Sequence, residues 1–300
     1  MVSIPAGPYG MGDTVDYAKD ARAHTVSVSA FYMDKNLVTI ELWQQVLAYA
    51  QSRGYVFYNF YASTLTGTSI KGASFGARHP VQTVSWHDAV KLCNARSEME
   101  GLTPVYYTDA ALTAVYRDGK TLTSAGKYIY PVLNIAMMDW AANGYRLPTE
   151  AEWEKAARGG AIGLRFPWGK NISQADARYS SPVLGQMYDM STGPVTGTDK
   201  GTYWKTTVPV CSFAANGFGL FDMTGNVREW IGDWYDANYY KVSPSSDPHG
   251  PVVAPNNTKR RVLRGGCYAS FSAAIRSANR DLYTESMSST TIGFRTVRKK

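Results

Sequence analysis

Residues 261–266 of the chain read RVLRGG, residues 276–280 read RSANR and residues 292–295 read IGFR. These three frames, rich in Arg and Gly, flank two stretches of small, polar and aromatic residues: CYASFSAAI at 267–275 and DLYTESMSSTT at 281–291. Neither stretch shows the alternation of a half-buried strand or the spacing of an amphipathic helix. The pattern therefore predicts two exposed loops held by a fixed frame.

The composition predicts a loop-rich globular chain. Its 300 residues are 44% hydrophobic and 13% aromatic, and they include 27 Gly and 14 Pro. Such a chain can bury a substantial core in which large aromatic side chains anchor irregular backbone. No linker or internal repeat divides it, so residues 1–300 are interpreted as a single domain. No run approaches the roughly 18 apolar residues of a membrane helix, so no transmembrane segment is expected.

Charge and cysteine content exclude several function classes. The formal net charge is +7, but Lys and Arg are scattered along the chain, which argues against nucleic acid as a partner. The three cysteines, Cys93, Cys211 and Cys267, are far apart, so neither a CxxC metal motif nor a disulfide framework is predicted. The first residues lack the regions of a signal peptide, which indicates a cytosolic protein or one whose leader was removed.

Three helix starts are indicated by capping residues. Thr39 and Ser85 each precede apolar residues at helical spacing, and Thr149 begins the capping box TEAE. Each predicted helix ends at a glycine: Gly54, Gly101 and Gly159. Alternation over residues 25–32 predicts a strand, and the Tyr-rich residues 102–145 predict short hairpins.

Motifs spread over nearly the whole chain carry a family resemblance. They are, in order, IPAG at 4–7, PVQTVSW at 80–86, RLPTEAEW at 146–153, PWG at 167–169, NGFGLFDM at 216–223, GNVREW at 225–230, RGG at 264–266 and GFR at 293–295. In this order they resemble the formylglycine-generating-enzyme (sulfatase-modifying factor) family. The resemblance implies an α+β fold of the C-type lectin-like class, loop-rich, with small antiparallel sheets and a few helices.

The residues that the family's oxidases use are not matched. In those enzymes two cysteines shortly after the Arg-Gly-Gly turn hold copper and perform the oxidation. Here the corresponding places carry Ser270 and a residue near Ala274, and the nearby thiol is Cys267, directly after Gly266. A second branch uses iron held by histidines of a further helical domain, and the four histidines here show no such spacing. The chain is therefore predicted not to be an enzyme, and His87 is interpreted as structural.

A third branch fits the C-terminal frames. Variable proteins of diversity-generating retroelements, treponemal ones among them, are similar to this chain in RGG, RSA-R and IGFR and vary between these frames. The resemblance implies a receptor-like or adhesin-like binding protein, diversified by a retroelement within residues 261–295, whose ligand is another macromolecule and most simply a protein. The predicted ligand-binding positions are Tyr268, Ala269, Ser270, Phe271, Ser272, Ala273, Ala274, Asp281, Leu282, Tyr283, Thr284, Ser286, Ser289 and Thr290.

The resemblance also implies which positions can vary. Adenine-directed mutagenesis of an AAC codon leaves the final C, and codons ending in C never encode Trp, Met, Gln, Lys or Glu. Glu285 and Met287 are therefore not expected to vary. Phe271 and Tyr283 are expected to be the main contacts, because aromatic side chains supply large contact area at low entropic cost. The frame residues expected to tie loop carbonyls to the body are Arg276, Arg280 and Arg295.

The stretch DMTGNVRE, which begins at Asp222, matches the family's calcium-binding stretch. The side chains of Asp222 and Glu229, with the carbonyls of Gly225 and Val227, would supply part of the roughly six to eight oxygens that Ca²⁺ prefers. A structural calcium ion is therefore a possible cofactor. Alternatively, the two carboxylates cap turns or pair with Arg228.

Two other functions remain as alternatives. One is a formylglycine-generating oxidoreductase that acts on sulfatase cysteine through Cys267 alone. The other is a calcium-dependent glycan-binding lectin, against which the absence of EPN-like or WND-like triplets argues. The resemblance implies display at the cell surface as a lipoprotein, although the chain shows no anchor and a cytoplasmic location stays open.

Overall fold

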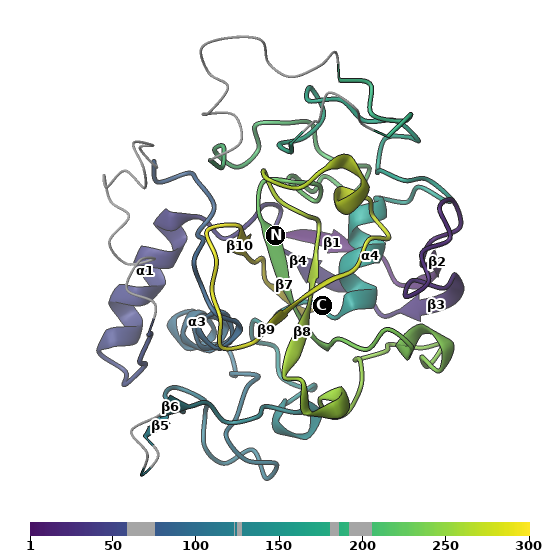
Figure 1. Ribbon diagram of the computed structural model, residues 1–300. Coiled ribbons are helices and arrows are strands. Elements are labelled where there is room, and N and C mark those ends of the chain that lie inside the picture. The colour runs from purple at the N-terminus through teal and green to yellow at the C-terminus, as the bar shows by residue number, and fades with distance from the viewer. Residues whose placement is uncertain (59–75, 123, 125–127, 181–185, 192–205) are drawn as a thin grey trace.

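The computed structural model describes residues 1–58, 76–122, 124, 128–180, 186–191 and 206–300 (Figure 1). In this part of the chain the α-helices are α1 (Ile40–Gln51), α3 (Trp86–Met99) and α4 (Glu150–Arg158). The strands are β1 (Val2–Ile4), β2 (Gly7–Met11), β3 (His24–Val28), β4 (Phe31–Met33), β5 (Thr121–Leu122), β6 (Tyr128–Ile129), β7 (Arg228–Trp234), β8 (Arg260–Arg264), β9 (Asp281–Thr284), β10 (Ile292–Gly293) and β11 (Val297–Lys299). Short 3-10 helices are η1 (Ile135–Met137), η2 (Tyr239–Lys241), η3 (Pro255–Asn257) and η4 (Ser272–Ile275).

The described strands form small sheets joined by long irregular segments. The orders are β10-β7-β8-β9, β1-β4-β11, β2-β3 and β5-β6. Neighbouring strands are antiparallel except β10 and β7, which run parallel. This arrangement confirms the predicted α+β, loop-rich fold class.

The central sheet separates two hydrophobic cores, because successive side chains of a strand point to opposite faces. Trp230 of β7 and Leu263 of β8 face the cluster built on α1 and α3. Their neighbours Ile231 and Val262 face the cluster built on α4 and the N-terminal strands. In Figure 1, accordingly, α3 and α4 lie on opposite sides of β7 and β8.

The predicted helix starts are confirmed. Thr149 and Glu152 form a complete capping box at α4, and Gly159 ends that helix with a left-handed φ of 58°. Thr39 caps α1 and Ser85 caps α3 through their side-chain oxygens. The predicted end of the first helix is wrong by two residues, because Ser52 is already its C-cap residue.

Two strand predictions need correction. The strand expected over residues 25–32 is divided into β3 and β4, which belong to different sheets. Residues 281–291 were expected to be loop throughout, but Asp281–Thr284 form β9. The ladder runs from Arg260↔Thr284 to Leu263↔Asp281, so the free edge of β8 imposes a strand on a sequence without strand periodicity.

No helix within the described ranges is both long and apolar enough to cross a membrane.

Candidate ligand-binding surface

Arg264, in the first frame, holds the backbone that follows the first inter-frame stretch. Its guanidinium donates to the carbonyl oxygens of Ser277 (2.8 Å) and Asn279 (2.7 Å) and to Oε2 of Glu154 (2.5 Å). The side chain is only 1% exposed. Burial alone would lower the pKa of Arg264, but Tyr240 and the carboxylates of Glu154 and Glu150 outweigh it and raise that pKa. The guanidinium therefore stays charged and fixes the loop end.

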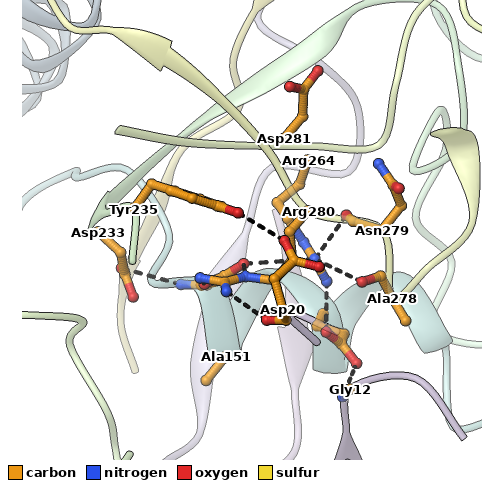
Figure 2. A network of polar contacts seen from close by, with 12 residues as sticks. Gly12, Asp20, Ala151, Asp233, Tyr235, Arg264, Ala278, Asn279, Arg280 and Asp281 are labelled. Carbon is orange, nitrogen blue, oxygen red and sulfur yellow. Dashed lines mark hydrogen bonds and ion pairs between the residues drawn. The ribbon is translucent and has the colours of Figure 1, made fainter. Parts of the chain in front are cut away.

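A second buried pair lies beside the first (Figure 2). Arg280 donates from Nε and Nη2 to both oxygens of Glu150, at 2.8 and 2.9 Å, and from Nη1 to the carbonyls of Asp20 and Asp236. Figure 2 shows Arg264 and Arg280 side by side above α4, with Tyr235 donating to Asp20. Bidentate Arg–carboxylate pairs of this kind are rigid, so β9 starts from a fixed point.

The remaining frame arginines are also paired. Arg276 donates to the carbonyl of Ala273 (2.8 Å) and to Asp13 (2.6 Å), which confirms the expected link between loop carbonyl and body. Arg295 donates to the carbonyl of Phe221 at 2.9 Å. Their main partners, however, are carboxylates from segments distant in sequence, which the sequence did not indicate.

Glu285, which was not expected to vary, is buried at the end of β9. Its carboxylate pairs with Nε of Arg261 at 3.2 Å and lies 3.7 Å from Nε2 of His87. Burial lowers the pKa of Arg261 to about 10, with Glu285 opposing the shift. Burial likewise lowers the pKa of His87, whose ring stacks on Tyr130 and meets the Tyr116 hydroxyl at 3.1 Å. His87 is thus buried among side chains of the protein.

The first inter-frame stretch divides into exposed and buried residues. Ala269 and Phe271 are exposed, and the Phe271 side chain keeps 53% of its accessible surface. Ser270, Ala273 and Ala274 are half-buried. Exposure was wrongly expected of Cys267 and Ile275, which are both 0% exposed, and of two predicted binding positions, Tyr268 (6% exposed) and Ser272 (1% exposed). Ser272 lies in η4, whose Ile275 packs in a core with Phe166 and Tyr179.

The second stretch presents β9 and the loop after it. Asp281, Leu282, Tyr283 and Thr284 are half-buried, Ser289 is half-buried, and Ser286 and Thr290 are exposed. Tyr283 packs against the first core, with its ring centroid 6.3 Å from that of Trp230. Tyr283 is therefore anchored at its base and offers only part of its ring to a partner.

The two stretches meet at the surface. The hydroxyl of Tyr268 donates to Oγ1 of Thr290 at 3.4 Å, and the Tyr268 backbone N–H donates to the carbonyl of Asn226. Arg228, at the start of β7, lies 3.2 Å from the Asp281 carboxylate in a partly exposed ion pair. The contact between Tyr268 and Thr290 thus joins the two predicted stretches.

The thiol nearest this region is buried. Cys267 is 0% exposed, and its Sγ lies 3.2 Å from Oγ of Ser270, which also accepts from the Cys267 backbone N–H at 3.0 Å. The second place expected to correspond to a family cysteine lies beside Ile275, which is fully buried. The described residues thus bring one thiol and one hydroxyl together here.

The predicted calcium ligands do not fit the ion. Both Glu229 oxygens accept from Arg295, at 2.7 and 3.0 Å, and neither side chain is exposed. Asp222 Oδ2 accepts from the backbone N–H of Cys211, which leaves its Oδ1 without a hydrogen bond among the described residues. Burial raises the pKa of both carboxyls. The alternative pairing of Asp222 or Glu229 with Arg228 is not found either, because Glu229 pairs with Arg295 and Arg228 pairs with Asp281.

A metal site is not found elsewhere in the described part of the chain. No group of three or more His, Cys, Asp or Glu side chains there could hold an ion.

Residues 1–300 match the family described as "Sulfatase-modifying factor enzyme 1-like domain". The chain belongs to this family. The formylglycine-generating enzyme of Streptomyces coelicolor is 32% identical over 307 residues, covering 98% of this chain and 87% of that enzyme.

Solved structures of similar proteins agree with this family assignment. Treponema denticola variable protein 1 has a TM-score of 0.68 and 24% identity, covering 100% of this chain and 95% of that protein. CarF has a TM-score of 0.65 and 28% identity, covering 100% of this chain and 97% of that protein. The C-type lectin-like fold predicted for this family member is confirmed, and the likeness to the treponemal protein concerns the fold alone.

The sequence did not indicate that Asp13 and Asp16, near the N-terminus, contact the frame arginine Arg276. Asp13 and Asp16 both accept from Arg276, and Asp16 also accepts from Arg165. These pairs join segments roughly 150 or 260 positions apart. The signal that could have found them is the surplus of acidic residues in residues 13–20, a loop with few apolar residues to hold it.

Proposed function

We propose that this chain is a non-catalytic binding protein that recognises a macromolecular ligand, of the protein class, through residues 269–274 and 281–290. The observation that carries the proposal is that this region combines a fixed backbone with exposed side chains. Buried arginines and main-chain bonds fix the backbone, whereas the side chains of Ala269, Phe271 and Ser286 are exposed.

The physical advantage of this arrangement is preorganisation. Ordering a loop during binding costs free energy, so a backbone that is already fixed leaves more of the contact energy for affinity. Exposed side chains can then be exchanged at little cost to folding, because surface substitutions usually change stability by less than about 0.5 kcal/mol. Phe271 supplies a large exposed apolar contact, and the exposed hydroxyl groups of Ser286 and Thr290 can supply hydrogen bonds to a ligand.

Multiple substitution can test whether the exposed side chains contribute to the stability of the fold. A chain carrying Ala269→Tyr, Phe271→Ser and Ser286→Asp together is expected to unfold within about 2 °C of the natural chain. A larger loss would show that these side chains belong to the framework, which would contradict the proposal.

We propose further that a retroelement diversifies these positions and that the protein is displayed at the cell surface. Sequences of the same locus from several isolates test the first part, with variation expected within the two inter-frame stretches and not at Glu285 or Met287. A nearby Asn-rich copy of the segment and a reverse transcriptase gene are expected. Protease treatment of intact cells tests surface display, and full protection would count against it.

Formylglycine generation is the second candidate, because the Streptomyces coelicolor relative bears that name. Against it stands the burial of Cys267 beside a serine hydroxyl in place of a second thiol. Incubation with a cysteine peptide of the sulfatase type, copper and oxygen is expected to give no aldehyde. Turnover that is lost in Cys267→Ser and kept in Cys211→Ser would overturn the binding proposal.

A further inference from the structure

We propose that the loop between β2 and β3 forms a second binding site, which takes an acidic sugar. A groove of about 530 Å³ opens there, a volume typical of small-ligand sites. It is lined by Asp13, Thr14, Tyr17, Ala18, Lys19, Arg22, Ala23 and Lys241. The strands that carry it lie across α4 from the central sheet (Figure 1), and the inference does not depend on the function proposed above.

The groove is formed by a braced loop. Asp13 Oδ1 accepts from the backbone N–H groups of Val15 (3.0 Å) and Asp16 (2.8 Å), and its Oδ2 accepts from Arg276 (2.6 Å). The Asp13 N–H donates to the carbonyl of Ala21 at 2.7 Å, which closes the loop on itself. A ligand would therefore meet a preformed surface with little ordering cost.

The charge of the groove is positive. Lys19 and Arg22 make no ion pair with any residue in the described ranges, and Lys241 donates to the neutral amide oxygen of Asn238. Two nearby carboxylates, those of Asp13 and Asp16, pair with arginines, and the carboxylate of Asp20 accepts from the Tyr235 hydroxyl. Three cations therefore line the groove against one paired carboxylate, that of Asp13, and an anionic group placed there would gain charge-assisted hydrogen bonds.

Tyr17 supplies a flat apolar face beside these charges. Its φ is 55°, a left-handed conformation that side chains other than Gly, Asn and Asp seldom adopt, and the side chain is 78% exposed. Strained residues of this kind cluster at ligand-binding sites. The exposed ring offers a flat face to the C–H groups of a sugar, and the small apolar side chains of Ala18 and Ala23 also line the groove.

The backbone argues against a nucleotide or a free phosphate. Sites for phosphate use several unpaired N–H groups that point to the ligand, as at a helix N-terminus or a backbone nest. Here the Asp13 carboxylate occupies the N–H groups of Val15, Asp16 and Ala18. The available groups are side-chain cations and an aromatic ring, which suit a sugar that bears a carboxylate or a sulfate.

The test is a calorimetric titration of the full chain with a sulfated disaccharide, a uronic-acid disaccharide, a neutral disaccharide, inorganic sulfate and a nucleoside monophosphate. At least one acidic disaccharide is expected to bind, more tightly than the neutral sugar, inorganic sulfate or the nucleotide. The double variant Lys19→Ala/Arg22→Ala is expected to weaken binding by about tenfold or more, the loss of roughly one charge-assisted hydrogen bond. Lys170→Ala/Lys299→Ala removes the same charge from exposed positions elsewhere and is expected to leave binding unchanged.

Tyr17→Asn separates folding from binding, because Asn tolerates the left-handed backbone while the ring is lost. Tyr17→Asn is expected to keep the stability of the natural chain and to weaken disaccharide binding. Tyr17→Phe keeps an aromatic ring and is expected to retain disaccharide binding. The proposal would be overturned if neither acidic disaccharide binds. It would also be overturned if the double variant binds the acidic disaccharide as tightly as the natural chain does. A third contrary result would be that inorganic sulfate or the nucleotide binds as tightly as the acidic disaccharide.

Discussion

Arg264→Leu is the sharpest test of the idea that buried arginines hold the C-terminal surface. The substitution keeps a bulky apolar stem but removes the guanidinium that bonds the carbonyls of Ser277 and Asn279 and the carboxylate of Glu154. Removing one partner of a buried ion pair costs about 3–5 kcal/mol. The three carbonyls that lose this donor, those of Ser277, Ala278 and Asn279, raise the expected loss to about 4–6 kcal/mol.

The loss is measured by thermal unfolding together with hydrogen exchange. At about 2 °C per kcal/mol for a chain of this size, the midpoint is expected to fall by roughly 10 °C. Amide exchange should accelerate over residues 277–280. Arg228→Leu is the matched control, because its ion pair with Asp281 is partly exposed and contributes at most about 1 kcal/mol. Equal losses in the two variants would refute the reasoning.

The same variant has a pH signature. Burial alone would raise the pKa of Glu154, but the charges of Arg158 and Arg264 outweigh burial and lower that pKa below its usual value. A carboxyl with a lowered pKa in the folded state stabilises the protein above its unfolded pKa and loses that contribution as the pH falls through the folded value. The difference between the natural chain and Arg264→Leu is therefore expected to shrink as the pH drops below about 4.5.

Three further outcomes are expected. Asp233→Asn should stabilise the chain at neutral pH, because burial raises the pKa of Asp233 well above its usual value and the carboxyl therefore loses stability for the fold as the pH rises. The gain, followed by denaturant unfolding, should vanish below about pH 4, and a gain that persists there would contradict this explanation. Gly266→Ala should cost about 3 kcal/mol by the same measurement, because the backbone φ is 66° and a Cβ would meet Cγ2 of Ile275 at 2.3 Å; a loss below about 1 kcal/mol would show that η4 can move aside. Adding Ca²⁺ or a chelator should leave the melting temperature unchanged, and a rise of several degrees with Ca²⁺ would show that Glu229 leaves Arg295 to bind the ion.

The features that followed from local sequence were predictable. Thr39, Ser85 and Thr149 mark helix starts because a capping hydrogen bond joins residues only two or three positions apart. The family motifs likewise identified the fold. Strand β9 was not predictable in this way, since its pairing comes from β8 and its own four residues lack alternation.

The candidate surface was predictable in position but not in detail. Burial of Tyr268 and Ser272 depends on contacts with residues distant in sequence, and no local pattern reports such contacts. The partners of the frame arginines were hidden for the same reason. Arg280 meets Glu150 across 130 positions, and only the folded chain brings such charges together.

Strand β9 lies at the edge of the central sheet, and its ladder to β8 consists of main-chain bonds. Those bonds are indifferent to the side chain with one exception: proline has no N–H to donate. Codons of the form NNC include a proline codon. A naturally diversified set of chains should therefore tolerate almost any reachable residue from 281 to 284, yet lack proline wherever the N–H faces β8. Pairing with β8 would thus limit which residues occur in β9, independently of any ligand.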